Sequence, residues 1–399
     1  MALAGHRVRG AKSGPDFIDP RFHQAATGRA SVNLDAWAMR PARLRALAAG
    51  PGLLVAEGAM GLFDGAPPDG RGSSADLAAA LGLPVLLIVD AGRMSQSVLP
   101  LVAGFAGHDR RISVGGVILN RVGSARHERI LRHALSPLPV PVLGAIPRLD
   151  DLHLPSRHLG LLQAGETDAL DAFIDRAATI CAAHVDLGAI LTLAEPMAPA
   201  PTRPLSPPPA RTIALADDIA FSFSYPHLLD DWQAAGAEIR RFSPLRNDPV
   251  PPADLVFLPG GYPELHAARL SLADVFLNSL RNAAQQADIY GECGGYMVLG
   301  EGLVDADGTR HAMAGLLPLE TSFADTRLHL GYRRVSAAGG SFPGTWAAHE
   351  FHYSTALSER GPRLFQAEDA EGNRLEPMGL IRGRVSGSYA HLIDRFSSP

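Results

Sequence analysis

Residues 289–297 read IYGECGGYM, and this segment says more about the architecture of the chain than any other. A short β-type run at 288–291 leads directly into Cys293, which has small residues on both sides. A sharp turn from a strand into a helix requires such flanks, and hydrolases hold their nucleophile on an elbow of this kind. The positive end of the following helix favours a thiolate, and the amide of Gly294 can face an oxyanion. We therefore predict that Cys293 is a nucleophile whose surroundings favour the thiolate.

Two further segments fit around this cysteine. LPGGYPE (258–264) follows an apolar run, so that exposed amides at Gly260 and Gly261 can complete an oxyanion hole. SYAHL (388–392) supplies His391 as the general base, at a separation typical of partners that meet only in the fold. A free cysteine is often simply a small buried apolar residue, and we keep that interpretation for Cys181 on its predicted helix. The glycines and the strand around Cys293 favour the catalytic interpretation.

Working outward, a proline-rich segment divides the chain. Residues 195–211 read EPMAPAPTRPLSPPPAR, which predicts a semi-rigid linker between a domain at 1–194 and a domain at 212–399. In the first half, Leu53–Glu57, Val85–Asp90 and 114–120 are continuous apolar runs that end in a polar residue. Such runs are typical of parallel strands buried on both faces, with alanine-rich helices at Ser74–Leu81 and 96–107 as crossovers.

The second half follows the same pattern. Thr212–Ala216 and Leu255–Leu258 predict strands, 271–287 predicts a helix, and the region from 315 onward predicts added antiparallel strands. The fold class is therefore α/β, with two domains that each contain a mostly parallel sheet flanked by helices.

Composition excludes several classes of protein. With 36 basic and 41 acidic residues, the net charge of −5 gives no reason to expect nucleic-acid binding. No apolar run is long enough for a membrane span, and the N-terminus lacks the pattern of a signal peptide. The two cysteines are far apart, which favours a reducing cytoplasm over a disulfide scaffold.

The quoted motifs resemble those of one known family. LPGGYPE, GECGGYM, SYAHL and AHEFHYS (348–354) are similar to the glutamine amidotransferase domain of cobyrinic acid a,c-diamide synthases and cobyric acid synthases. KSGPDFIDP (12–20) and EGAMGLFDG (57–65) resemble the diamide synthase form, including hydrogenobyrinic acid a,c-diamide synthases. The resemblance covers nearly the whole chain and keeps the order of the family's motifs.

The resemblance implies a flavodoxin-like glutamine amidotransferase domain behind a P-loop-type domain similar to dethiobiotin synthetases. The C-terminal domain would hydrolyse glutamine, and the N-terminal domain would use ATP and Mg²⁺ to convert the a and c acetate groups of a corrin acid into acyl phosphates. Ammonia then forms the amides. It also implies further site residues: Tyr332 for glutamine, Lys12 and Asn120 for ATP, Asp16 and Glu57 for the metal, and Asp19 and Asp64 for substrate. Whether the chain forms a homodimer stays an open question at this point.

The sequence departs from the family in two places. It contains no P-loop of the form GxxxxGK[ST], so we expect either a true start upstream of Met1 or a variant that binds ATP poorly. The commoner amidotransferases carry a glutamate two residues after the histidine, where this chain has Ile393. That leaves the residue that orients His391 open, with Glu350 and Asp394 as candidates.

Two alternative functions also stay open at this point. The first is the same chemistry on another tetrapyrrole acid, and the second is a non-catalytic binding protein that keeps the fold. Analysis of the amidated products from several candidate acids would distinguish the first alternative from the diamide synthase reaction. Measurement of glutamate release from glutamine would distinguish a binding protein from an enzyme.

Overall fold

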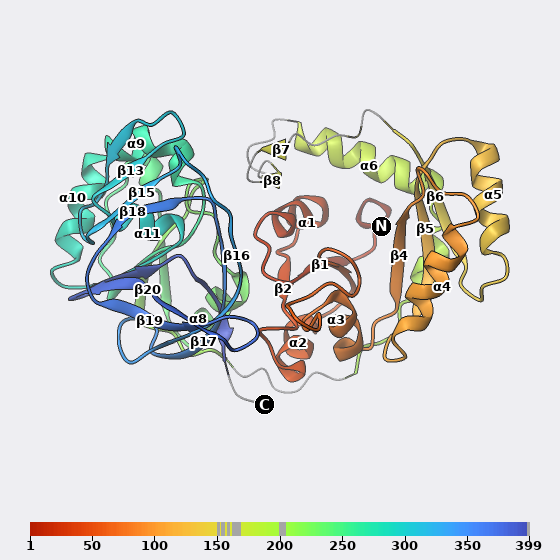
Figure 1. Ribbon diagram of the computed structural model, residues 1–399, viewed down its shortest axis with the longest axis horizontal. Coiled ribbons are helices and arrows are strands. Elements are labelled where there is room, and N and C mark those ends of the chain that lie inside the picture. The colour runs from red at the N-terminus through yellow and green to blue at the C-terminus, as the bar shows by residue number, and fades with distance from the viewer. Residues whose placement is uncertain (150–151, 153–155, 158–159, 162–168, 199–204, 397–399) are drawn as a thin grey trace. The chain divides into compact units, whose positions relative to one another are not determined.

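The computed structural model describes residues 1–149, 152, 156–157, 160–161, 169–198 and 205–396 (Figure 1). The chain divides into two compact units. Unit 1 comprises Met1–Gly65 and Gly70–Arg203, and unit 2 comprises Ala66–Asp69 and Pro204–Pro399. The predicted linker at 195–211 lies partly outside the described residues, since 199–204 are not among them.

Unit 1 begins with a three-stranded parallel sheet in the order β2-β1-β3. A short 3-10 helix, η1 (Ala2–Ala4), comes first in the chain. The strands are β1 (Val8–Ser13), β2 (Val32–Leu34) and β3 (Leu53–Glu57). The helices of this part are α1 (Asp19–Thr27), α2 (Pro41–Ala48) and α3 (Ser74–Leu81). Ser73 caps α3 by accepting a hydrogen bond from the Asp76 amide, which explains why this helix begins where the sequence predicts.

A second parallel sheet of unit 1 has the order β4-β5-β6. Its elements are β4 (Val85–Asp90), β5 (Val114–Val122), β6 (Val142–Pro147), α4 (Val98–His108), α5 (Ala125–Leu135), α6 (Leu170–His184) and α7 (Leu187–Thr192). A two-stranded pair, β7 (Ser156–Arg157) and β8 (Gly160–Leu161), precedes α6. The predicted strands are confirmed, and 114–120 extends by two residues.

The prediction that both faces of these strands are buried is wrong in part. Val55 on β3 is 47% exposed and Ile88 on β4 is 65% exposed. The reason is that the parallel strands form two separate sheets, in which β3 and β4 are both edge strands. Each of these edges has a strand partner on one side only among the described residues.

Unit 2 is built on a ten-stranded mixed sheet. Its order is β10 (Glu238–Phe242), β9 (Thr212–Ala216), β11 (Leu255–Leu258), β12 (Asp288–Glu292), β21 (Val385–Ser388), β20 (Arg374–Arg382), β19 (Arg363–Glu368), β16 (His329–Ala337), β17 (Gly344–His352) and β22 (His391–Arg395). The first five strands are parallel and the others pair antiparallel, which confirms the predicted antiparallel addition after residue 315.

A smaller sheet and several helices complete unit 2. The sheet has the order β14 (Arg310–Ala312), β13 (Gly302–Val304), β15 (Leu319–Ser322) and β18 (Thr355–Glu359). The helices are α8 (Pro226–Ala234), α9 (Ala267–Ser271), α10 (Asp274–Ala283) and α11 (Gly294–Leu299), with 3-10 turns η3 (Pro244–Arg246) and η4 (Pro263–His266). The observed helix α10, Asp274–Ala283, is therefore shorter than the helix predicted at 271–287.

The core of unit 2 surrounds the strand–helix junction of β12 and α11. Every residue of α11 is buried, and α10 buries Phe276, Leu277 and Leu280 on one face, as its apolar spacing requires. The junction is therefore held by packing on all sides. In the described part of the chain, no helix combines the length and the apolar character needed to cross a membrane.

Candidate active site

Cys293 stands at the turn between β12 and α11, as the sequence predicts. Its backbone has φ 46° and ψ −105°, a conformation that costs free energy for any residue with a β-carbon. The Cys293 amide donates to the Ser388 carbonyl (2.8 Å), which ties the elbow to the end of β21. The thiol donates to the Phe351 carbonyl across 3.9 Å. Such a constrained turn is typical of a nucleophile elbow.

His391 lies next to this cysteine, with Gly260 between them. A β-carbon added at Gly260 would lie 3.1 Å from His391 Nε2 and 3.3 Å from Cys293 Cβ, and it would overlap His391 Cε1. The Nε2 edge of the imidazole therefore faces the nucleophile. Only a residue without a side chain fits at 260 with His391 in this position.

The predicted oxyanion loop also reaches the elbow. The Gly260 carbonyl accepts a hydrogen bond from Phe223 N (2.9 Å), which fixes the orientation of the peptide that joins Gly260 to Gly261. The Gly261 amide lies 3.1 Å from the position that a Gly294 β-carbon would take. Glycine at both positions lets these two backbones approach, so their amides border the same small region beside Cys293.

The electrostatic environment differs from the prediction for the thiol. Burial, reinforced by the Glu264 carboxylate, raises the pKa of Cys293 despite the helix N-terminus. Burial, together with the charges of the neighbouring His349 and His352, lowers the pKa of His391 to about 3. Both shifts favour a neutral thiol and a neutral imidazole. The direction of the Cys293 shift is therefore opposite to the predicted thiolate, although a neutral imidazole can accept the thiol proton.

A residue that the sequence interpretation missed faces the other edge of the base. Glu292 Oε2 lies 3.7 Å from His391 Nδ1, and Glu292 Oε1 accepts a hydrogen bond from the Leu392 amide (3.2 Å). Burial raises the pKa of Glu292 to about 8, against the lowering effect of that amide. Its position directly before the nucleophile was the one available signal, since the strand pairing of Glu292 with Ser388 brings the elbow beside His391.

The candidates Glu350 and Asp394 make other contacts. Glu350 Oε1 contacts His352 Nε2 (3.0 Å), and its Oε2 accepts from Arg333 (2.8 Å). Asp394 Oδ1 accepts from the Arg395 amide (2.8 Å). Neither contact brings a carboxylate oxygen to the Nδ1 edge of His391.

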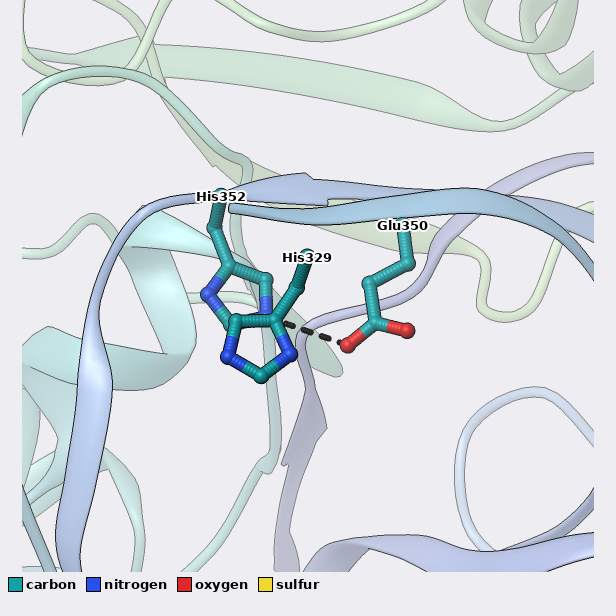
Figure 2. Close-up of side chains that lie close together, drawn as sticks. All are labelled: His329, Glu350 and His352. Atoms are coloured by element: carbon teal, nitrogen blue, oxygen red, sulfur yellow. Dashed lines mark hydrogen bonds and ion pairs between the residues drawn. The ribbon is translucent and has the colours of Figure 1, made fainter. Parts of the chain in front are cut away.

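Two residues of the segment AHEFHYS, Glu350 and His352, are buried and form a polar cluster with the half-buried His329 of β16 (Figure 2). One possible ligand atom from each lies within 4.8 Å of the others, as in some metal sites. The two imidazole rings, however, are stacked at 4.6 Å with planes 6° apart. Because a histidine binds a metal in the plane of its ring, two such parallel rings do not point at one ion. Within the cluster, His352 Nε2 contacts Glu350 Oε1 at 3.0 Å, and His329 stacks on His352.

Tyr332 lies on the same sheet as the base. On β16 it stands opposite His349 on β17, and His349 in turn stands opposite His391 on β22. The Tyr332 and His349 rings meet edge to face, with centroids 5.5 Å apart. The structure therefore brings Tyr332 to the neighbourhood of the base through one intervening histidine.

Unit 1 brings together four of the residues predicted to handle ATP, metal or substrate. Lys12 Nζ lies 2.5 Å from Asp19 Oδ2, 3.4 Å from Glu57 Oε1 and 4.0 Å from Asp16 Oδ2. Burial, together with the Asp19 charge, raises the pKa of Asp16 to about 6. Three carboxylates thus surround one buried ammonium group at the carboxyl ends of β1 and β3, where ligands bind in parallel sheets. Such oxygen donors suit Mg²⁺.

Asp64 and Asn120 each accept a hydrogen bond from a nearby backbone amide. Asp64 Oδ2 accepts from the Gly61 amide (2.9 Å) and closes a turn. Asn120 ends β5, beside Asp90 of β4, and its Oδ1 accepts from the Arg121 amide (2.9 Å). Their predicted roles in substrate and ATP binding gain no support from these contacts.

Comparison with known proteins agrees with this division of chemistry. Residues 212–397 match the CobB/CobQ-like glutamine amidotransferase domain, and residues 17–156 match an AAA domain. A hydrogenobyrinate a,c-diamide synthase from a Sinorhizobium species is 53% identical over 98% of this chain and 92% of the relative. Proteins of the same name from Rhizobium meliloti and Rhodobacter capsulatus are 52% and 51% identical, over 98% of this chain and 92% and 93% of the relatives.

These relatives match nearly the full chain at more than half of its positions, and they are named as synthases. The non-catalytic alternative is therefore not favoured. The protein is a glutamine-hydrolysing, ATP-dependent carbon–nitrogen ligase, and the chain belongs to the hydrogenobyrinate a,c-diamide synthase family.

Proposed function

We propose that this chain amidates the a and c acetate side chains of hydrogenobyrinate, in cobalamin biosynthesis, with glutamine as the nitrogen donor and ATP as co-substrate. One observation carries the proposal. An elbow cysteine and a neutral histidine lie on either side of a glycine in a chain 53% identical to a hydrogenobyrinate a,c-diamide synthase. Between cobyrinate and hydrogenobyrinate, the names of the relatives favour the second.

Glutamine hydrolysis follows from the geometry of unit 2. His391 Nε2 accepts the Cys293 thiol proton, and the sulfur attacks the side-chain carboxamide carbon of glutamine. The amides of Gly261 and Gly294 stabilise the oxyanion of the tetrahedral intermediate. Its carbon–nitrogen bond breaks as His391 returns the proton to the departing nitrogen, which leaves as ammonia. Water then hydrolyses the thioester to glutamate and restores the thiol. Tyr332 is proposed to help bind glutamine.

Carboxylate activation is assigned to unit 1. A carboxylate is a poor acyl donor because its leaving group is oxide, whereas an acyl phosphate releases phosphate when ammonia attacks. Lys12 is proposed to neutralise phosphate charge, and Asp19 to bind substrate or metal. Asp16 and Glu57 would hold Mg²⁺, which supplies positive charge to the phosphate oxygens. The convergence of their carboxylates around Lys12 supports this assignment.

Two measurements test the proposal. Wild type should release glutamate from glutamine, and Cys293→Ser should reduce that rate at least about 1,000-fold, because the hydroxyl of serine is a much weaker nucleophile than a thiol. Mass spectrometry of products from a panel of tetrapyrrole acids should show two added amides on hydrogenobyrinate. Full activity in Cys293→Ser, or a preference for another acid, would refute the corresponding half of the proposal.

We place this reaction in the cytoplasm. Cys181 and Cys293 are both free, which fits a compartment that keeps thiols reduced.

A further inference from the structure

We infer that Glu292, the residue directly before the nucleophile, is the positioning residue that orients His391 for glutamine hydrolysis. The inference rests on the proposed function, because it assigns a role within the cysteine–histidine pair. It fills the position that Ile393 leaves without a carboxylate in this sequence.

The first argument is that one carboxylate holds the base at two points. Glu292 Oε1 accepts the hydrogen bond of the Leu392 amide, so it fixes the backbone next to His391. The other oxygen faces the ring at Nδ1, 3.7 Å away. This distance exceeds a hydrogen bond by less than about 1 Å, and catalytic contacts often shorten when substrate binds.

The second argument comes from the two edges of the imidazole. Nε2 faces Gly260 and Cys293, while Nδ1 faces Glu292. A carboxylate at Nδ1 favours the tautomer with a proton on Nδ1, which leaves the Nε2 lone pair free to take the thiol proton. The same carboxylate then stabilises the imidazolium that forms.

The third argument is the burial of Glu292. It is 4% exposed, and an apolar cavity lined by Trp232, Phe257 and Phe342 borders it. A carboxylate in such surroundings is costly unless a polar or charged partner faces it. His391 and the Leu392 amide are such partners, so the ionised state of Glu292 and the imidazolium state of His391 stabilise each other.

The other nearby carboxylates do not fit this role. Both oxygens of Glu350 are engaged, by His352 and by Arg333. Asp394 stands three residues after His391 on β22, beyond a register shift in the pairing with β17, and its Oδ1 accepts a hydrogen bond from the Arg395 amide (2.8 Å). Glu292 is the carboxylate with an oxygen 3.7 Å from His391 Nδ1, and this contact favours it among the three.

The test compares glutamine hydrolysis by four full-length variants: Glu292→Gln, Glu292→Ala, Glu292→Asp and Asp394→Asn. Gln keeps the shape of the side chain and the acceptor for the Leu392 amide, but it removes the charge. Above pH 8, where the Glu292 carboxylate is ionised, we expect Glu292→Gln to lower kcat about 100-fold or more with KM for glutamine within threefold, since removal of the carboxylate behind a catalytic histidine has large effects. Ala should lose at least as much activity, and Asp should recover part of it.

Asp394→Asn should reduce kcat far less than Glu292→Gln. A kcat of Glu292→Gln within threefold of wild type would overturn the inference, as would a larger loss in Asp394→Asn. A loss that appears only as a raised KM would also overturn it, because a positioning role acts on the chemical step. Failure of the proposed function is distinguishable, since in that case wild type itself would release no glutamate.

Discussion

The substitution Gly260→Ala should strongly reduce the rate of glutamine hydrolysis while the protein stays folded. The β-carbon of Gly260→Ala would overlap His391 Cε1 by more than about 1 Å relative to an ordinary carbon–carbon contact, and would press on Cys293 Cβ at 3.3 Å. The backbone at this position is tethered through the Phe223 amide, so the imidazole has to move. The φ of Gly260 is not positive, and the effect is therefore steric at the base.

A displacement of about 1 Å in a catalytic group can reduce the rate about 100-fold. We therefore expect kcat/KM for glutamine to fall at least that far in Gly260→Ala, as measured by glutamate release. Overpacking should lower the free energy of unfolding by about 1–3 kcal/mol, as measured by denaturant titration. Gly339→Ala is the matched control, because nothing lies within 4 Å of its β-carbon and its φ is not positive. A folded Gly260→Ala variant with activity near that of wild type would refute this account of the site.

Three further outcomes are expected. The pKa of Asp16 in the folded protein is about 6, above its unfolded value, so the stability that Asp16 contributes is lost as pH rises through 6. Relative to wild type, Asp16→Asn should therefore increase its free energy of unfolding by at most about 2 kcal/mol between pH 4 and 7, as measured by denaturant titration. Because Glu292 ionises near pH 8, kcat for glutamine should rise through that pH, and a profile of Glu292→Gln should lack this rise. EDTA should leave the glutamate release rate unchanged, since the rings of His329 and His352 are parallel; an EDTA-sensitive rate would contradict that interpretation.

The strands of the parallel sheets and the Cys293 elbow could be predicted because apolar runs and flanking glycines are local signals. The helix predicted at 271–287 is longer than α10, which spans Asp274–Ala283, because the chain leaves the helix after Ala283 and enters β12 at Asp288. The pairing of Glu292 with His391 has no local signal, since it depends on Ser388 lying beside Glu292 in the sheet. The state of the thiol could not be predicted either, because burial in the folded core outweighs the helix terminus at Cys293.

The exposed apolar side chains of Val55 and Ile88 have a consequence for handling the protein. In the described part of the chain β3 and β4 are edge strands of their sheets, a position at which a further strand can pair, and the exposed Val55 and Ile88 add apolar surface there. At high concentration, copies of the chain should recruit one another by adding strands at these places.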